Sequence, residues 1–371
     1  MEADTFKPHS VSRRNLKGDT LRAVVEDIPL LVIVVAFTAT VLILGWTVGV
    51  PEHVNILASV NLVALLTAAY LLPAVAGFLT HRVIICRRSL FDSSTWRELG
   101  CWFLDPARTL AFFMVLVGLC FFVSAFSAFK ASIPTIQPFI WDVRFMEWDR
   151  LLHLGLHPWQ ILQPFLGWPV ITHAVDFVYL MWFPVLWLTI IWQAWHGSRN
   201  SHIRSQFLVA FAVCWILLGV IAAVLFSSAG PIYFGAVTGA PDPYVPLLDY
   251  LHTVNAQDSL RAISTQNILW SAYTDPGGNQ VAGISAMPSM HVSMGVLLTL
   301  LGFRSHRWLG WMYAAFAGMI FLGSVHLAWH YAIDGYVAAV GTLAIWWASG
   351  VSTRWWQDRN RPLWNSPISH V

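Results

Sequence analysis

The sequence predicts an all-α, polytopic membrane protein of about eight transmembrane helices. Three observations predict this class: the composition, a series of apolar runs, and the distribution of basic residues. Of the 371 residues, 57% are hydrophobic and 11% are charged, whereas soluble domains have roughly a quarter charged residues. The 21 Trp and 23 Phe are an excess typical of membrane–water interfaces. Most of the surface is therefore expected to face lipid.

Eight apolar runs approach the ~20 residues that cross a bilayer as a helix. The sixth and eighth runs begin with polar residues, so hydropathy supports them less strongly. The runs cover roughly residues 28–50, 55–79, 109–129, 173–195, 205–229, 285–303, 308–328 and 332–352.

Lys and Arg gather in alternate connections, as the positive-inside rule requires of cytoplasmic segments. The predicted cytoplasmic set is Lys7, Arg13, Arg14, Lys17, Arg22, Arg82, Arg87, Arg88, Arg97, Arg108, Arg199, Arg204, Arg304, Arg307, Arg354, Arg359 and Arg361. The other four of the 21 Lys and Arg residues, on the opposite side, are Lys130, Arg144, Arg150 and Arg261. Both termini are therefore predicted to be cytoplasmic.

This layout divides the chain into three parts. Residues 1–108 are predicted to form a cytoplasmic segment, two helices and a basic inner loop, residues 109–352 a six-helix membrane domain, and residues 353–371 a cytoplasmic tail. Two outer segments are long. Residues 130–172 mix aromatic and charged residues at helical spacing, which predicts an amphipathic stretch on the membrane surface. Residues 230–284 are rich in Gly, Pro, Asp and Asn, and we expect a substrate-facing lid there.

Two short polar motifs lie at the outer ends of apolar runs. The first is Pro288-Ser289-Met290-His291, and the second runs from His326 to Tyr336 and includes His330 and Asp334. Ionisable residues that border a membrane span are expensive, so they indicate function. The topology, predicted from the basic residues alone, places both motifs at the same face of the membrane.

The spacing of these residues suits chemistry at phosphorus. Asp334 follows His330 by four residues, so on a helix its carboxylate lies beside the imidazole and fixes the tautomer. His330 is then a candidate nucleophile, and His291 from another helix a candidate general acid and base. Ser289 at a helix start is a candidate phosphate ligand. The alternatives are a helix cap for Ser289, a structural hydrogen bond for the His–Asp pair, and a packing role for a lone histidine.

Pro-Ser-x-His followed some 40 residues later by His-x3-Asp resembles the type 2 phosphatidic acid phosphatase superfamily of lipid phosphatases and phosphotransferases. The resemblance covers roughly residues 109–352, which implies a six-helix phosphatase-type core with two extra helices before it. It implies that Ser289 binds phosphate, that His291 is the general acid and base, and that His330 is the nucleophile, steered by Asp334. No cofactor and no metal are implied.

The sequence departs from this family at two places. The family's first motif, a Lys followed seven residues later by Arg-Pro, is expected to be absent, and the third motif has Ser324 where the family has an arginine. The phosphate site is thus predicted to lack its usual cations, although a phosphoryl transition state needs positive donors. We expect Arg261, the one cation of the predicted lid, to substitute, and His326 to add a donor.

The family's third motif usually starts with Ser-Arg. The His-Tyr-x-x-Asp form at residues 330–334, which lacks that pair, is similar to the inositol phosphorylceramide synthase branch, which transfers a phospho-headgroup between lipids. Gly230-Pro231-x-Tyr233 and the Asp176-x-x-Tyr179 pair also resemble that branch. The resemblance implies acceptor binding for Asp176, Tyr179 and Tyr233. For Asp176, a structural bond to a neighbouring helix is an equal alternative.

Three rival interpretations stay open. His326, His330 and Asp334 at four-residue spacing could bind zinc, although a straight helix rarely brings three successive ligands to one ion. A lipid or solute transporter would show repeats and polar residues at mid-depth, and neither is evident. A structural membrane protein would not need the matched set of polar residues.

The sequence thus predicts a membrane enzyme whose partners are the bilayer and a phospholipid, sphingolipid or polyprenyl phosphate, and no nucleic acid. The site is expected at the outer face. The lack of Asn-x-Ser/Thr sites in the outer loops favours a bacterial inner membrane, where the outer face is periplasmic. The donor lipid, and whether the acceptor is water, inositol or a glycan, stay open.

Overall fold

The computed structural model describes residues 16–48, 56–87, 89, 92–103, 105–195, 201–275 and 283–365. The described residues form helices joined by loops, with no strand among them. Part of the predicted lid, residues 276–282, lies outside the described residues. So do five of the predicted cytoplasmic cations, which are Lys7, Arg13, Arg14, Arg88 and Arg199.

Helices occupy all eight of the predicted apolar ranges. They are α1 (Leu16–Val48), α2 (Ile56–Thr80), α4 (Pro106–Ile136), α7 (Pro169–Leu180) with α8 (Trp182–Trp195), α9 (Ser201–Ile216) continued by η3 (Leu217–Ala222) and α10 (Ala223–Leu225), α14 (Met290–Ser305), α15 (Arg307–His326) and α16 (Ala332–Asn365). Among the described residues, six of these segments are long and apolar enough to cross a membrane. The other two are α14 and α16, the sixth and eighth ranges; α14 is a shorter apolar helix of 16 residues.

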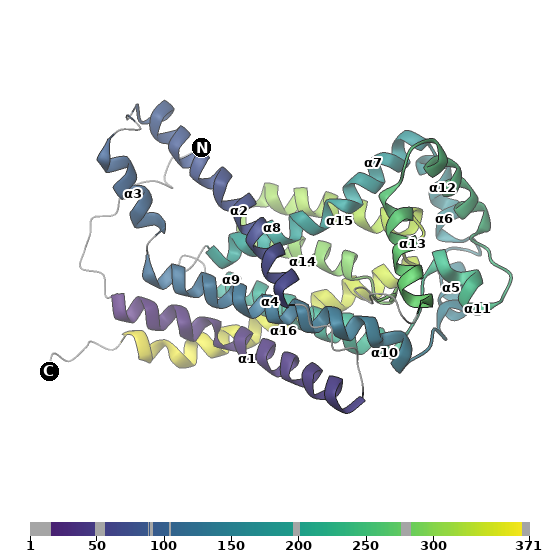
Figure 1. Ribbon diagram of the computed structural model, residues 1–371, viewed down its shortest axis with the longest axis horizontal. Helices are drawn as coiled ribbons and strands as arrows, with labels where there is room; N and C mark the ends of the chain where they lie inside the picture. The colour runs from purple at the N-terminus through teal and green to yellow at the C-terminus, as the bar shows by residue number, and fades with distance from the viewer. Residues whose placement is uncertain are drawn as a thin grey trace.

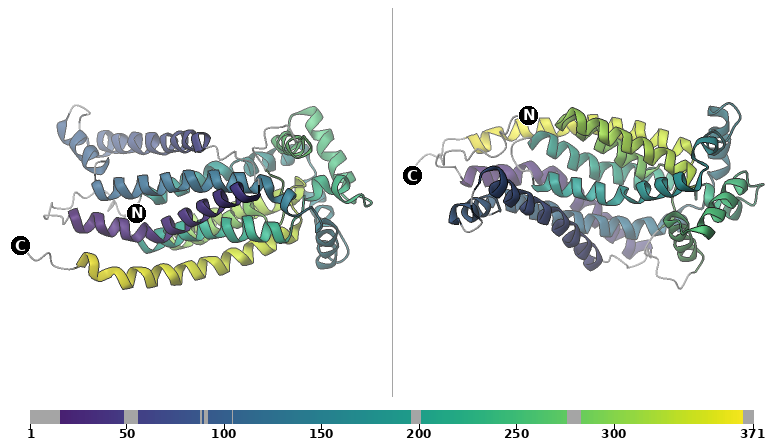
Figure 2. Two further views of the ribbon diagram at one scale, coloured as in Figure 1. Left: turned by 60° about the horizontal axis from the view of Figure 1, so that its bottom comes forward. Right: turned by 90° about the horizontal axis from the view of Figure 1, so that it is seen from above.

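The short helices of the two outer segments lie at one end of the bundle (Figure 1). They are α5 (Asp142–Leu152), α6 (Pro158–Leu166), the 3-10 turn η4 (Pro231–Tyr233), α11 (Phe234–Thr238), α12 (Val245–Gln257) and α13 (Arg261–Thr274). The start of α1, the end of α16 and helix α3 (Ser93–Phe103) lie at the opposite end, and the views of Figure 2 agree. The two ends of the described chain therefore lie at the same end of the bundle, as the predicted topology requires.

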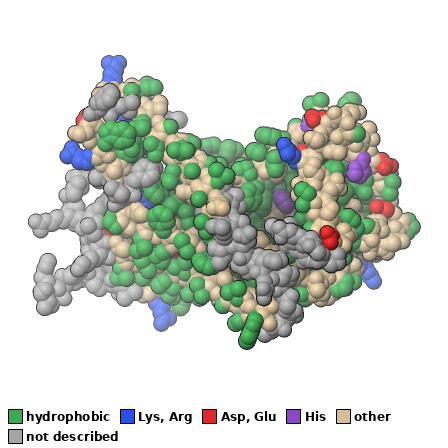
Figure 3. All heavy atoms as spheres, in the orientation of Figure 1, with side chains coloured by type: hydrophobic (Ala, Val, Ile, Leu, Met, Phe, Trp, Pro, Cys, Tyr) green, Lys and Arg blue, Asp and Glu red, His purple; other side chains and the backbone are tan. Residues whose placement is uncertain are grey.

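Helix α4 contacts both N-terminal helices, and α1 also packs directly against α9 and α16. Helix α4 also packs against α8, while α14 packs against α15 and α16. A buried ion pair joins α1 to α9, because Arg204 donates from Nη1 and Nη2 to the Asp27 carboxylate at 2.5 and 3.0 Å. The outer helix faces expose large apolar side chains such as Trp46, at 92%, and Leu65, at 67%, and Figure 3 shows hydrophobic side chains over the middle of the bundle. Such faces suit contact with lipid.

The two predicted outer segments have more regular structure than expected. The 130–172 segment begins inside α4, which continues to Ile136, and ends inside α7. Between these helices it forms α5 and α6, so it is not one continuous amphipathic stretch. The 230–284 segment holds η4, α11, α12 and α13. The Gly and Pro residues that indicated a loop therefore separate short helices.

Candidate active site

One cavity of about 450 Å³ lies at the boundary between the long helices and the short ones. Its wall comes from α4, α8, α9 and α14, together with residues of α13 and of the loop between α15 and α16. Figure 3 shows the surface hollowed beside α13, with a histidine side chain in the hollow. Both His291 and His330 line the cavity. The two predicted motifs therefore meet at one concave site.

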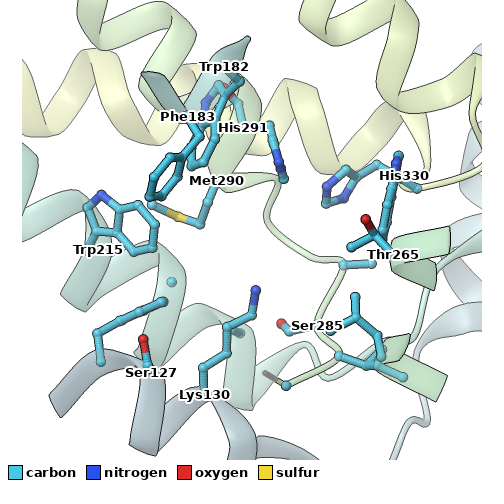
Figure 4. Close-up of a pocket in the computed structure, with 18 of the residues that line it drawn as sticks. Ser127, Lys130, Trp182, Phe183, Trp215, Thr265, Ser285, Met290, His291 and His330 are labelled. Atoms are coloured by element: carbon cyan, nitrogen blue, oxygen red, sulfur yellow. The ribbon is translucent and has the colours of Figure 1, made fainter. Parts of the chain in front are cut away.

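The close-up in Figure 4 shows the rings of His291 and His330 side by side, one from α14 and one from the loop before α16. Their centroids are 5.9 Å apart and their planes meet at 61°. This separation leaves both rings within reach of one phosphoryl group placed between them.

His330 is held by the residues that follow it. Its Nδ1 lies 3.3 Å from Oδ2 of Asp334, which also accepts a hydrogen bond from the Tyr331 backbone N–H at 3.1 Å. This contact leaves Nε2 as the nitrogen available to a substrate. Burial lowers the pKa of His330 to about 3, a backbone hydrogen bond with Ala286 opposes this shift, and the charge of Lys130 adds to it. The imidazole is therefore neutral near pH 7, as a nucleophile must be.

His291 contacts two aromatic rings. Tyr179 stacks on it with centroids 4.6 Å apart and planes at 23°, and the Trp182 ring lies 4.3 Å away. Trp182 also donates from its indole nitrogen to the His291 backbone carbonyl at 3.1 Å. These contacts fix the ring so that it faces the cavity, which is the condition for a positioned acid or base.

Lys130 is the cation of this cavity that the sequence interpretation missed. It extends from the last turns of α4 toward the two histidines (Figure 4) and lines the cavity. It stands seven residues before Gln137-Pro138, so the spacing of the first motif is present with Gln in place of Arg. The expectation that the phosphate site lacks a first-motif cation is therefore wrong for the lysine. A search for a Lys seven residues before any residue followed by Pro would have found Lys130.

Four other predicted residues line the cavity, and their contacts differ. Both carboxylate oxygens of Asp176 accept hydrogen bonds from the backbone N–H groups of Arg261 and Ala262, at 2.8 and 2.9 Å, so Asp176 caps α13. The Tyr233 hydroxyl donates to the Gln266 carbonyl at 2.7 Å. Among the described residues the buried Tyr179 hydroxyl has no hydrogen-bond partner, so it is free to bind a ligand.

Ser289 and His326 do not belong to the residues that line the cavity. Ser289 is fully buried and does not line the cavity; its hydroxyl accepts a hydrogen bond from the Val292 N–H and caps α14. The Nε2 atom of His326 lies 2.9 Å from the Thr172 hydroxyl, away from the cavity lining. Their predicted phosphate contacts stay predictions. The helix cap, weighed above as the alternative for Ser289, matches its contacts.

The zinc alternative needs His326, His330 and Asp334 to face one ion. His326 instead pairs with Thr172, and His330 pairs with Asp334. Within the described ranges no group of three or more His, Cys, Asp or Glu side chains is arranged to hold a metal ion. The helix ends at His326 and resumes at Ala332, which breaks the regular spacing that the alternative assumed.

Two acids of α5 support the loop that carries His330, and the sequence interpretation missed both. Asp149 accepts from the Ala332 and Ile333 N–H groups at 2.8 and 2.9 Å. Asp142 accepts the Tyr331 hydroxyl at 2.8 Å and the backbone N–H groups of the 229–230 turn. Each side chain is about 1% exposed. Burial raises the pKa of Asp149 to about 7, against the effect of its two backbone hydrogen bonds.

Gly230 makes the turn that Asp142 holds. Its φ is +96°, and a side chain there would have its Cβ 2.6 Å from the Trp329 carbonyl oxygen. Only glycine combines this φ with so close an approach. The Gly-Pro-x-Tyr motif therefore places the start of the predicted lid directly against the residue before His330.

Comparison with known proteins gives one match. A family model described as the PAP2 superfamily matches residues 143–348, which is more than half of the chain. The match begins after α4, so it includes both histidine motifs and excludes Lys130. No curated protein and no solved structure matches the chain.

Proposed function

Because the chain belongs to the PAP2 superfamily, we propose that it is a membrane phosphatase or phosphotransferase that acts on a lipid phosphate through a phosphohistidine at His330. One observation supports this most directly. The rings of His291 and His330, from separate helical segments, lie 5.9 Å apart in one cavity with Lys130. A purely structural site would not need two imidazoles and a lysine around one cavity.

In the first step, Nε2 of His330 attacks phosphorus and the bond from phosphorus to the leaving oxygen breaks. His291 gives its proton to that oxygen, which departs as an alcohol. Asp334, bonded to Nδ1, stabilises the positive charge that develops on His330. Lys130 and the exposed rim residue Arg261 offset the negative charge on the equatorial phosphoryl oxygens.

In the second step, His291 takes a proton from an acceptor hydroxyl, whose oxygen attacks phosphorus and frees His330. Water as acceptor gives a phosphatase, and a second alcohol gives a phosphotransferase of the inositol phosphorylceramide synthase type. Two successive displacements retain configuration at phosphorus. The free Tyr179 hydroxyl is suited to hold the acceptor, and Tyr233 shapes the wall beside it.

We place this chemistry at the outer face of the membrane, with both termini in the cytoplasm. The distribution of Lys and Arg supports that orientation. Helix α13, which lines the cavity, lies at the end of the bundle opposite the start of α1 and the end of α16 (Figure 1).

The test is turnover of a lipid phosphate by the purified full chain in a bilayer. His330→Ala and His291→Ala should each lose activity by a factor of roughly 10²–10⁴ or more, because each removes a group that acts on the reacting atoms. Both variants should keep the thermal unfolding temperature of the wild type within a few degrees. Near-normal turnover in folded His330→Ala would refute the covalent route. Absence of lipid-phosphate turnover in the wild type would leave the transporter alternative standing.

A further inference from the structure

The cavity has two chemically different ends. His291, His330 and Lys130 gather at one end, beside Ser285 and Thr265 (Figure 4). Aromatic and aliphatic side chains line the other end, where Figure 4 shows Phe183 and Trp215. The apolar residues that line the cavity include Phe122, Phe126, Leu186, Trp187, Phe211 and Trp215. The polar end suits a phosphate, and the apolar end cannot bind one.

The apolar end extends along the helix axes. Phe122 precedes Lys130 by eight residues on α4, which at ~1.5 Å per residue is a rise of about 12 Å. Phe211 precedes Gly219 by the same number of residues along α9 and η3, and both line the cavity. The cavity therefore runs from the histidines into the bundle, parallel to the helices. A lipid has the same shape, with its phosphate at the interface and its chain along the membrane normal.

We propose that the apolar end of the cavity is a binding site for one hydrocarbon chain of the phosphate substrate, so that the protein selects its substrate by the chain as well as by the phosphate. This inference rests on the proposed function. The volume of about 450 Å³ is within the range of pockets that hold a single small ligand. One chain thus enters the protein, and any second chain stays in the bilayer.

Two residues set the usable length of this site. Gly219 lies in the π-helical turn η3, and a Cβ there would lie 3.0 Å from the Phe126 ring and 3.3 Å from Sδ of Met290. A larger side chain at 219 would therefore fill the passage between the histidines and the deep end. Phe211 is 1% exposed at the deep end, and a smaller side chain there would lengthen the site.

The experiment measures the affinity of methyl-, hexyl-, decyl- and tetradecylphosphonate for the full chain in nanodiscs. Phosphonates keep the charged head and resist cleavage. In the wild type, affinity should rise by up to roughly four-fold per methylene from methyl to decyl. Gly219→Leu should reduce the decyl-to-methyl affinity ratio at least ten-fold. Phe211→Leu should raise the tetradecyl-to-decyl ratio. Gly318→Leu is the matched control, because a Cβ at this helical glycine meets nothing within 4 Å.

Each outcome of this experiment either supports or overturns the inference. Equal affinity for all four phosphonates in the wild type would overturn the inference. So would a chain preference that Gly219→Leu and Phe211→Leu leave at the level of Gly318→Leu, because the preference would then come from the bilayer. If Gly219→Leu does not fold, the Phe211→Leu arm alone decides. A chain preference that depends on the cavity, in a protein that turns over no lipid phosphate, would refute the proposed function and leave this site in place.

Discussion

His291 lies against the rings of Tyr179 and Trp182, whereas the Nδ1 atom of His330 lies beside the Asp334 carboxylate. The two imidazoles thus have different partners, and these suit different tasks. A carboxylate stabilises the cation that forms when a histidine bonds to phosphorus. Adjacent rings orient a histidine without fixing its charge, which suits a group that gives and takes a proton.

Lys130 gives the sharpest prediction at this scale. Lys130→Met should lower kcat/KM by roughly 10²–10³, because a cation beside the phosphoryl group acts mainly in the transition state. Lys130→Arg should recover part of the loss, because it keeps the charge. Arg261→Ala should also be impaired, since Arg261 lines the same cavity. Kinetics of the three variants would check this, and near-normal turnover in Arg261→Ala would remove Arg261 from the site.

The low pKa of His330, about 3, predicts how stability changes with pH. The unfolded histidine has a pKa of about 6.5, so between pH 3 and 6.5 the unfolded chain binds more protons and stability falls as the pH falls. The wild type should therefore lose about 2 kcal/mol more than His330→Asn between pH 7.5 and 5. Thermal unfolding at the two pH values measures this. An equal loss in both proteins would show that His330 is not buried in neutral form.

At the scale of elements, α5 links the surface of the bundle to the loop that carries His330. Asp149 binds the first N–H groups of α16, and Asp142 binds the hydroxyl of Tyr331, the neighbour of His330. These bonds hold the loop between α15 and α16. The family's third motif has an arginine at the position of Ser324, shortly before this loop. The sequence shows acids at helical spacing but not which of them are buried, because that depends on where α16 begins. The prediction of a surface helix thus missed the inward face of α5.

Removing these acids should lower both stability and activity. Asp142→Ala and Asp149→Ala each leave buried N–H or O–H donors unpaired, at a cost of about 1–3 kcal/mol per donor. The loop before α16 would then loosen, so kcat should fall more than KM rises. Glu147→Ala is the matched control, since Glu147 is an exposed acid of the same helix. If kcat in Asp149→Ala equals that in Glu147→Ala while the unfolding temperature falls, α5 stabilises the fold without positioning His330.

At the scale of the whole molecule, the sequence was sufficient for the helical class and for the meeting of the two histidine motifs. Apolar runs and motif spacing are local signals, and a helical membrane fold turns them directly into structure. The contacts of Ser289, His326 and Asp176 depend on which helices lie beside them, and no local signal specifies that. The same holds for the short helices of the 230–284 segment, because α11 packs against α5, α12 against α13 and α13 against α7.

The central claim is that one phosphoryl group passes through His330 while His291 serves as acid and base. An aryl phosphate with an acidic leaving group tests it most directly, because its departure needs no proton while the second step still needs a base. In His291→Ala the phosphoenzyme should therefore accumulate, and mass spectrometry of the quenched protein should find the phosphoryl group on the peptide that contains His330. A phosphoryl group on any other residue, or none while product still forms, would contradict the account.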